Sequence, residues 1–130
     1  MVREEKLSLK QAECIKLKDI DTFASSSIGE RIKRAYAYGG VKREQPFVFE
    51  YDRQLVQGVI DLYFIEDGQL VIVDYKTDRV LRGRAGEDEL RRRYSIQLDY
   101  YAMALSQITG LKVKEKVIYS FALGRSLTVE

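Results

Sequence analysis

Two aspartates and a lysine interrupt two apolar segments near the middle of the chain. Asp61 lies within GVIDLYFI, and Asp74 and Lys76 lie within LVIVDYK. Carboxylate oxygens are ligands that Mg²⁺ prefers, and a lysine beside them can stabilise negative charge that develops on a substrate. Two carboxylates about 5 Å apart repel each other by on the order of 3 kcal/mol at an effective dielectric constant near 20, so they need a proton or a cation between them. We therefore predict a site for a hard divalent cation at Asp61 and Asp74, with Lys76 pointing the same way.

The alternative for Asp74 and Lys76 is an ordinary surface pair, because an aspartate and a lysine two residues apart on a strand are usually solvated or salt-bridged. The two segments are otherwise apolar on both faces. On the carboxylate face the apolar neighbours are Tyr63 with Ile72 and Ile65 with Leu70. Charges placed among side chains that normally pack favour a functional site over a surface pair.

The dipeptide Asp67-Gly68 predicts a two-residue turn that joins these segments as a hairpin. This turn sets Asp61 directly opposite Asp74 and Val59 opposite Lys76, on one face. The other face then holds Ile60 with Tyr75, Leu62 with Val73 and Phe64 with Val71. A shift of one residue in the pairing would send Asp61 to the opposite face, so the predicted site depends on this register.

A helix is predicted after the hairpin, where apolar residues recur every three or four positions and the pattern ends at Gly110. The stripe consists of Leu90, Tyr94, Leu98, Tyr101, Leu105 and Ile108. Gln97 falls on this stripe although it is polar, so its amide needs a partner. It can bind a metal ligand or a water at the site, with the Tyr101 hydroxyl beside it, or it can bind the backbone at the edge of the stripe.

The remaining elements predict an α/β domain. Helices are expected over residues 8–18 and 19–38, the second interrupted at Ser25 to Gly29, and strands over 46–50, 56–65, 70–76, 112–123 and 126–129, with a connection over 78–93 that merges into the helix. The order is therefore helices, three strands, a helix and strands. This order can build a central sheet flanked by helices.

The composition narrows the class of protein. The chain has 130 residues, 45% of them hydrophobic, which is enough for one domain with a core. It contains no histidine, so the chemistry must run on carboxylates, lysine or tyrosine. Cys14 is the single cysteine and excludes an internal disulfide or a cysteine-ligated cluster, which indicates a reducing, cytoplasmic setting. No run is apolar enough to predict a signal peptide or a membrane span.

The net charge of +2 is too small to indicate a nucleic-acid partner by itself. Arginines do cluster after the hairpin, at Arg79, Arg82, Arg84, Arg91, Arg92 and Arg93, together with several acidic residues. Such a run is usually a solvated helix face. Beside a metal site it could instead hold phosphates on either side of a scissile bond.

Three motifs in order resemble one family. They are Gly58-x-x-Asp61, Asp74-Tyr75-Lys76-Thr77 and Gln97-x-x-x-Tyr101. They are similar to the GxxD, DYKT and QxxxY motifs of the RecB-type branch of the PD-(D/E)XK nucleases. With Arg43-Glu44-x-Pro46-Phe47 upstream, the chain is most similar to the C-terminal nuclease domains of the AddA (RexA) group, the helicase–nuclease subunits of bacterial AddAB (RexAB). The resemblance covers about two thirds of the chain.

The resemblance implies a restriction-endonuclease-like fold and a role for each motif residue. The metal ligands would be Asp61, Asp74 and the backbone carbonyl of Tyr75, the catalytic lysine would be Lys76, and the supporting residues would be Gln97 and Tyr101. The expected ion is Mg²⁺, with Mn²⁺ as an alternative. A water would attack the phosphodiester phosphorus, oriented or deprotonated by Lys76.

The resemblance also implies a larger protein. It predicts DNA as substrate, unwinding by an ATP-dependent helicase region of the same full-length protein, AddB (RexB) as partner in a heterodimer, and a role in double-strand-break repair and recombination. The chain has no GxxxxGK[ST] loop for ATP. Residues 1–130 would then be a single nuclease domain and a C-terminal fragment, with residues 1–40 helical and 44–130 forming the nuclease core.

One feature departs from the family pattern. Members carry a histidine on a helix upstream of GxxD as a further metal ligand, and this sequence has none. We expect that the piece starts downstream of that helix; the alternative is that Glu30, Glu44 or Glu50 replaces the histidine. The competing functional class is a non-catalytic nuclease-like module that binds DNA or docks onto a partner protein, and the intact Asp61, Asp74 and Lys76 argue against it.

Overall fold

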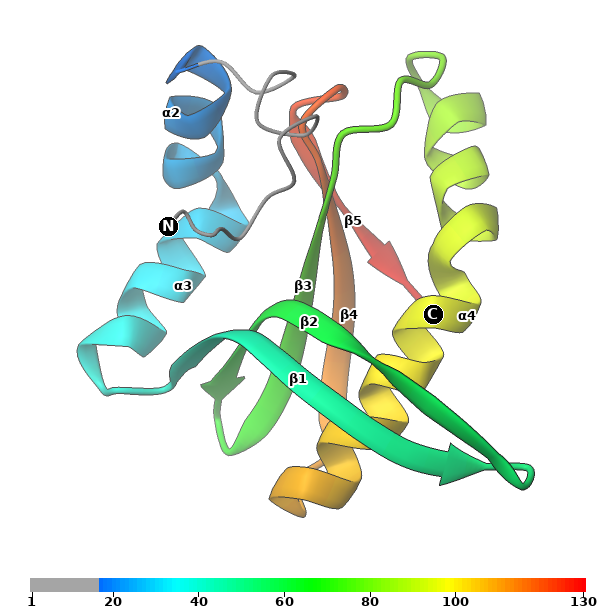
Figure 1. The fold of residues 1–130 in the computed structure, drawn as a ribbon. Helices are drawn as coiled ribbons and strands as arrows, with labels where there is room; N and C mark the ends of the chain where they lie inside the picture. The colour runs from blue at the N-terminus through cyan, green and yellow to red at the C-terminus, as the bar shows by residue number, and fades with distance from the viewer. Residues whose placement is uncertain (1–16) are drawn as a thin grey trace.

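The computed structural model describes residues 17–130, which form one mixed five-stranded sheet with helices on both faces (Figure 1). The elements are α2 (Leu17–Ser25), α3 (Ser27–Ala37), β1 (Val41–Tyr51), β2 (Gln54–Glu66), β3 (Gln69–Lys76), α4 (Arg84–Thr109), β4 (Val113–Ser120) and β5 (Arg125–Val129). The strands follow chain order across the sheet, and only β3 and β4 pair in parallel. The predicted α/β architecture with a mixed sheet is confirmed. Cys14 and most of the helix predicted over residues 8–18 lie outside the described residues.

The sheet is buried on both faces. The cluster between the sheet and α4 includes Ile60, Tyr63, Leu70, Ile72, Leu90, Leu98, Leu105 and Ile118. The cluster between the sheet and α3 includes Ile28, Leu62, Phe64, Val71, Val73, Tyr75, Val117 and Tyr119. Residues of β3 alternate between the two clusters, so this strand is apolar on both faces, as a central strand with a parallel neighbour requires.

The helix ends follow local sequence signals. The Ser26 hydroxyl accepts a hydrogen bond from the Gly29 amide at 3.1 Å and caps α3. A β-carbon at Gly29 would lie 2.2 Å from the carbonyl oxygen of Phe23, so glycine permits the tight junction of α2 and α3. The predicted interruption at Ser25 to Gly29 is therefore confirmed.

The helix α4 begins at Arg84, so more of the predicted connection over residues 78–93 is helical than the sequence indicated. Gly110 ends it with φ of 75°, as predicted. Although α4 has 26 residues, no helix within residues 17–130 is both long and apolar enough to cross a membrane.

The hairpin turn and its register are confirmed where β2 and β3 pair. Asp67 and Gly68 have φ of 54° and 75°, as a two-residue turn of this kind needs. The pairing runs from Glu66 with Gln69 to Leu62 with Val73 and ends there. The predictions that Val59 lies opposite Lys76 and that Ile60 pairs with Tyr75 are therefore wrong.

The alternation of faces breaks at Asp61. Ile60 belongs to the α4-side cluster although Leu62 belongs to the α3-side cluster. Opposite Asp61, between the pairs Arg43–Leu62 and Gln45–Ile60, Glu44 takes a positive φ of 52°. Such an irregularity bends a strand and redirects its side chains. It lets the first half of β2 leave β3.

Beyond this break, β1 and β2 continue as a two-stranded ribbon along α4 (Figure 1). The ribbon is longer than the strand predicted over residues 46–50, because β1 runs from Val41 to Tyr51. Aromatic rings hold it to the helix: the Phe47 and Tyr101 centroids are 5.4 Å apart, and those of Phe49 and Tyr100 are 6.2 Å apart. The last half of α4 is thus covered by the ribbon.

An ion network fastens α3 to the edge of the hairpin. Arg31 donates to both carboxylate oxygens of Glu66, at 3.1 Å and 2.7 Å, and also binds Glu115. Lys114 lies 2.8 Å from Glu66. Hydrogen bonds from Arg31 and then from Lys114 lower the pKa of Glu66 to about 2. The network therefore favours the ionised carboxylate.

We expect Glu66→Gln to lower the free energy of unfolding by about 1 kcal/mol at pH 7, because it removes the charge that Arg31 and Lys114 bind. The lowered pKa of Glu66 stabilises the fold above its ordinary value of 4.5 and ceases to do so as the pH falls toward 2. The gap between parent and variant should close over that interval in urea melts. Glu30→Gln is the matched control, because its pair with Lys33 is exposed. A gap that persists at pH 2 would show that the charge of Glu66 is not the cause.

Candidate active site

Asp61, Asp74 and Lys76 meet at the point where β2 separates from β3. The Asp61 Oδ2 accepts a hydrogen bond from the Tyr75 amide at 2.9 Å, which ties β2 to β3 just past their last paired residues. Asp74 is 2% exposed, and its Oδ2 lies 2.9 Å from the Lys76 Nζ. The three residues predicted from the sequence are thus brought together, although by side-chain contacts rather than by a continued strand pairing.

The electrostatics of the pair are those of two carboxylates without a cation. Burial first, and then the charge of Asp74 and a hydrogen bond shared with it, raise the pKa of Asp61 to about 7. The Tyr75 amide and the Lys76 ammonium oppose this rise without cancelling it. A proton therefore occupies the pair at and below neutral pH, in the place that a bound cation could take.

The oxygens at the site fit a hard divalent cation in part. The Asp74 Oδ2 is buried and makes no well-directed hydrogen bond despite its closeness to Lys76. Two carboxylates suit Mg²⁺, which keeps several waters and needs few protein ligands. Within residues 17–130, however, no group of three acidic, histidine or cysteine side chains is placed to hold a metal. Glu30, Glu44 and Glu50 therefore do not complete the site as the predicted alternative required.

Gln97 lies at the site, but its partner differs from the one predicted. The Lys76 Nζ donates to the Gln97 Oε1 at 3.1 Å. The amide therefore holds the lysine, and neither a carboxylate nor the backbone. This contact brings α4 into the site from one turn before the ribbon contacts.

Tyr101 lies beside the carboxylates and mainly packs. Its ring is 7% exposed and meets Phe47 edge-on. Burial, and then the charges of Asp74 and Asp61, raise the pKa of Tyr101. A β-carbon at Gly58 would lie 3.1 Å from the Phe47 ring, so glycine in the GxxD motif leaves room for this ring. The motif glycine thus shapes the wall behind the carboxylates.

Sequence reasoning missed two residues next to Lys76. The Lys76 Nζ lies 4.0 Å from the centroid of the Tyr94 ring, and the Tyr94 hydroxyl donates to Asp78 at 2.6 Å. The sequence pattern assigns Tyr94 only to the apolar stripe of the helix. The signal that could have found it is its spacing, because Tyr94 lies three residues before Gln97 and so shares its helix face.

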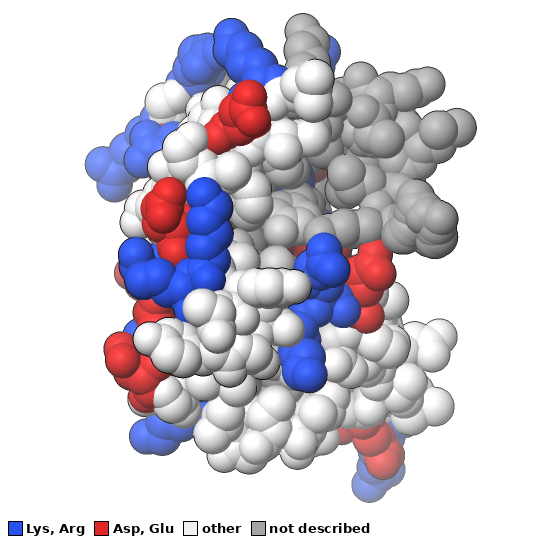
Figure 2. Space-filling view, turned by 90° about the vertical axis from the view of Figure 1, so that its left-hand side faces the viewer, with Lys and Arg blue, Asp and Glu red and all other residues white. Residues whose placement is uncertain are grey.

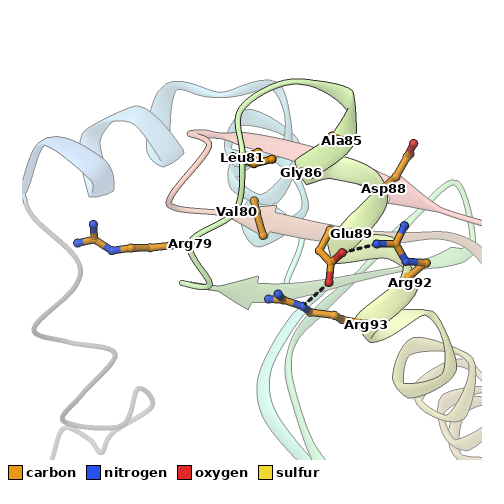
Figure 3. Close-up of a pocket in the computed structure, with 9 residues that line it drawn as sticks. All are labelled: Arg79, Val80, Leu81, Ala85, Gly86, Asp88, Glu89, Arg92 and Arg93. Atoms are coloured by element: carbon orange, nitrogen blue, oxygen red, sulfur yellow. Dashed lines mark hydrogen bonds and ion pairs between the residues drawn. The ribbon is translucent and has the colours of Figure 1, made fainter.

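The arginine run lines a pocket of about 720 Å³ between the loop after β3 and the first turns of α4 (Figure 3). Arg92 and Arg93 both bind Glu89, and Arg93 also binds Asp78 at 2.9 Å. Arg79 extends away from the helix (Figure 3). Most of these guanidinium groups are thus paired with acids of their own helix, which favours the solvated face over a cradle for phosphates.

The charges on the side that carries α2 and α3 are also mixed. Figure 2 shows basic and acidic side chains interspersed across this face, without a broad area of one sign. A surface of this kind gives weak long-range attraction for a polyanion.

Comparison with known proteins places the chain in a family. Residues 10–127 match the model of the PD-(D/E)XK nuclease superfamily. A relative from Thermoanaerobacter pseudethanolicus, the AddA-type subunit of an ATP-dependent helicase/nuclease, is 39% identical over 142 residues, which cover 98% of this chain and 11% of the relative. Proteins of the same name from Acetivibrio thermocellus and Lachnoclostridium phytofermentans are 39% and 33% identical, over 98% and 100% of this chain.

The chain spans only 11% to 12% of the length of these relatives. The resemblance to AddA-type helicase–nuclease subunits, inferred from three short motifs, is confirmed by similarity that extends over almost the whole chain. The chain belongs to the PD-(D/E)XK nuclease superfamily, and its mixed sheet between helices is the restriction-endonuclease-like fold of that family.

Proposed function

We propose that the chain is the metal-dependent exonuclease domain of a longer ATP-dependent helicase–nuclease and that it hydrolyses phosphodiester bonds of DNA. The observation that carries this proposal is the buried pair of Asp61 and Asp74 with Lys76 in contact with it. A buried carboxylate pair with one raised pKa is costly for the fold, and such costs are usual at sites that bind or react.

Each residue has a role that its position supports. Asp61 and Asp74 would hold Mg²⁺ or Mn²⁺, with the Tyr75 carbonyl as a further ligand and waters in the remaining positions. The bound ion would supply Lewis-acid stabilisation of the phosphoryl oxygens and a more acidic water. Lys76 would orient the attacking water and stabilise the developing negative charge. Gln97 would hold Lys76, and Tyr101 would pack behind the carboxylates.

The partners follow from the relatives that share this domain. We propose that residues 1–130 form a single nuclease domain and that a helicase region of the same full-length protein delivers DNA to it. The second protein of the heterodimer would be AddB (RexB), and the complex would act in double-strand-break repair and recombination in the cytoplasm. These proposals rest on the names of the relatives, which describe one subunit of an ATP-dependent helicase/nuclease.

Manganese titration tests the metal site directly. Mn²⁺ added below one equivalent to the 130-residue chain should broaden the amide NMR signals of Asp61, Asp74, Tyr75 and Lys76, and excess Mg²⁺ should restore them. Asp61→Ala should remove the effect, whereas Asp88→Ala, on the exposed start of α4, should not. Broadening centred on any other acidic cluster would reject the proposed site and favour a non-catalytic module.

The 130-residue chain alone should cut DNA weakly. Two carboxylates and a carbonyl give a divalent cation few ligands, the sequence supplies no histidine, and a net charge of +2 gives little affinity for phosphates. The measurement is degradation of labelled single-stranded DNA with millimolar Mg²⁺ or Mn²⁺. Rapid degradation that is lost in both Asp61→Ala and Lys76→Ala would show that the chain completes its own site, contrary to this expectation.

A further inference from the structure

The surroundings of Lys76 leave one direction of its ammonium group without a polar partner. One N–H points to the Gln97 Oε1 at 3.1 Å, and the Asp74 Oδ2 lies 2.9 Å away. The Tyr94 ring lies 4.0 Å from the Nζ, at the distance of a cation–π contact. The Lys76 side chain is only 15% exposed. Such a contact is strongest where water is excluded, so the ring is a substantial part of what surrounds the charge.

The Tyr94 ring is itself fixed in place. Its hydroxyl donates to the Asp78 Oδ2 at 2.6 Å, and the Arg93 guanidinium donates to the same oxygen at 2.9 Å. Asp78 follows Lys76 by two residues, at the point where the chain leaves β3. The contacts therefore close a loop, from Lys76 along the backbone to Asp78, across to Tyr94 and back to the Lys76 ammonium.

The hydroxyl remains a donor throughout the ordinary pH range. Burial, and then the hydrogen bond to Asp78, raise the pKa of Tyr94 to about 12. The hydrogen bonds from Tyr94 and Arg93 keep the pKa of Asp78 below its ordinary value, although burial acts in the opposite direction. The anchor is thus a charge-assisted hydrogen bond from a neutral phenol to a carboxylate.

We propose that Tyr94 is a positioning residue for Lys76: its ring, anchored by Asp78, holds the ammonium against Asp74 and Gln97 in the place that phosphodiester hydrolysis requires. This inference rests on the proposed function. Lysine has a long and flexible side chain, and a misplacement of about 1 Å at a reacting group can cost about 100-fold in rate. The contact of Tyr94 with the lysine, rather than with DNA or metal, defines its role.

The competing explanation is that Tyr94 only packs, since it borders the α4-side core. The matched control for packing is Tyr100, which is also a partly buried tyrosine of α4 and contacts the rings of Phe49 and Tyr51 on the ribbon. Tyr100→Leu removes a ring of equal size from the same helix without touching Lys76. Tyr94→Phe keeps the ring and removes only the anchor to Asp78.

The first measurement is independent of cutting. In the metal-free 130-residue chain, the ring should shift the NMR signals of the Lys76 ε-methylene protons upfield of those of exposed lysines. Tyr94→Leu should abolish this shift, Tyr94→Phe should keep most of it, and Tyr100→Leu should leave it unchanged. A Lys76 signal at the position of an exposed lysine in the parent chain would overturn the inference.

The second measurement is DNA cutting by the full-length helicase–nuclease with ATP and Mg²⁺. Tyr94→Leu should lower kcat for cutting about 10- to 100-fold and leave KM for DNA and the rate of unwinding within about twofold, because the ring does not contact DNA. Tyr94→Phe should recover most of the rate, and Tyr100→Leu should match the parent.

The two measurements separate the possible failures. If the parent cuts and Tyr94→Leu cuts equally well, Tyr94 only packs and the inference is overturned while the proposed function stands. A rise in KM with kcat unchanged would also overturn it, since that result assigns the ring to DNA binding. If the parent shows the shifted Lys76 signal but the full-length helicase–nuclease does not cut, the proposed function fails and the positioning role fails with it.

Discussion

Asp74→Ala in the full-length helicase–nuclease is expected to lower cutting of DNA at least about 1,000-fold and to leave ATP-driven unwinding intact. Asp74 is 2% exposed and contacts both Asp61 and Lys76, so its removal takes away a proposed metal ligand and the partner of the proposed catalytic lysine together. Groups that stabilise charge in a transition state typically contribute about 100- to 1,000-fold each. The two losses should therefore combine in one substitution.

The assay is linear DNA with ATP and Mg²⁺, in which unwinding and cutting are followed with separate labels. Asp88→Ala is the control, because Asp88 is a half-exposed carboxylate whose partners are Arg84 and Arg91. Asp74→Ala that cuts at the parental rate would remove Asp74 from the site. Loss of unwinding as well as cutting would show that the substitution disrupts more than this domain.

Asp61→Asn is expected to stabilise the metal-free chain by about 2 kcal/mol at pH 8. The pKa of Asp61 is raised from 3.8 to about 7 in the folded state, so ionisation of Asp61 above pH 7 works against the fold. The penalty is absent below pH 4, grows between pH 4 and pH 7, and is complete above pH 7. Asparagine lacks this penalty and can still accept the hydrogen bond of the Tyr75 amide. The same substitution should weaken binding of Mn²⁺, so function and stability oppose each other here.

Thermal or urea melts in EDTA at pH 4 and at pH 8 measure this effect. The comparison variant is Asp74→Asn, which also removes one charge of the pair but deprives Lys76 of its ion-pair partner, so it should gain less stability than Asp61→Asn. Equal melting of Asp61→Asn and parent at pH 8 would show that the pair carries no electrostatic penalty in solution.

The hairpin could be predicted from sequence because two local signals agree there. The turn residues Asp67 and Gly68 require positive φ, and the alternation of apolar side chains on both strands permits only one register. The confirmed pairing from Glu66 with Gln69 to Leu62 with Val73 is the result. The end of α4 at Gly110 was predictable for a similar local reason, the left-handed conformation of the glycine that caps it.

The geometry around the site was not predictable in the same way. The break at Asp61 depends on a positive φ at Glu44, a residue with no strong preference for that conformation, and on rings of α4 that draw the ribbon away from β3. The sequence assigns Tyr94 to the core because an aromatic residue on a helical stripe usually packs. Its contact with Lys76 forms only once α4 lies across the sheet.

The topology of the sheet also sets the order in which the site is assembled during folding. The turn between β2 and β3 closes a short loop, and hairpins of this kind form within about 1 to 10 μs. The parallel pairing of β3 with β4 has to wait for the crossover through α4, and contacts between residues distant in sequence form more slowly. We therefore expect Asp61 and Asp74 to become neighbours in the first hairpin, while Gln97 and Tyr94 close around Lys76 only when β4 joins the sheet.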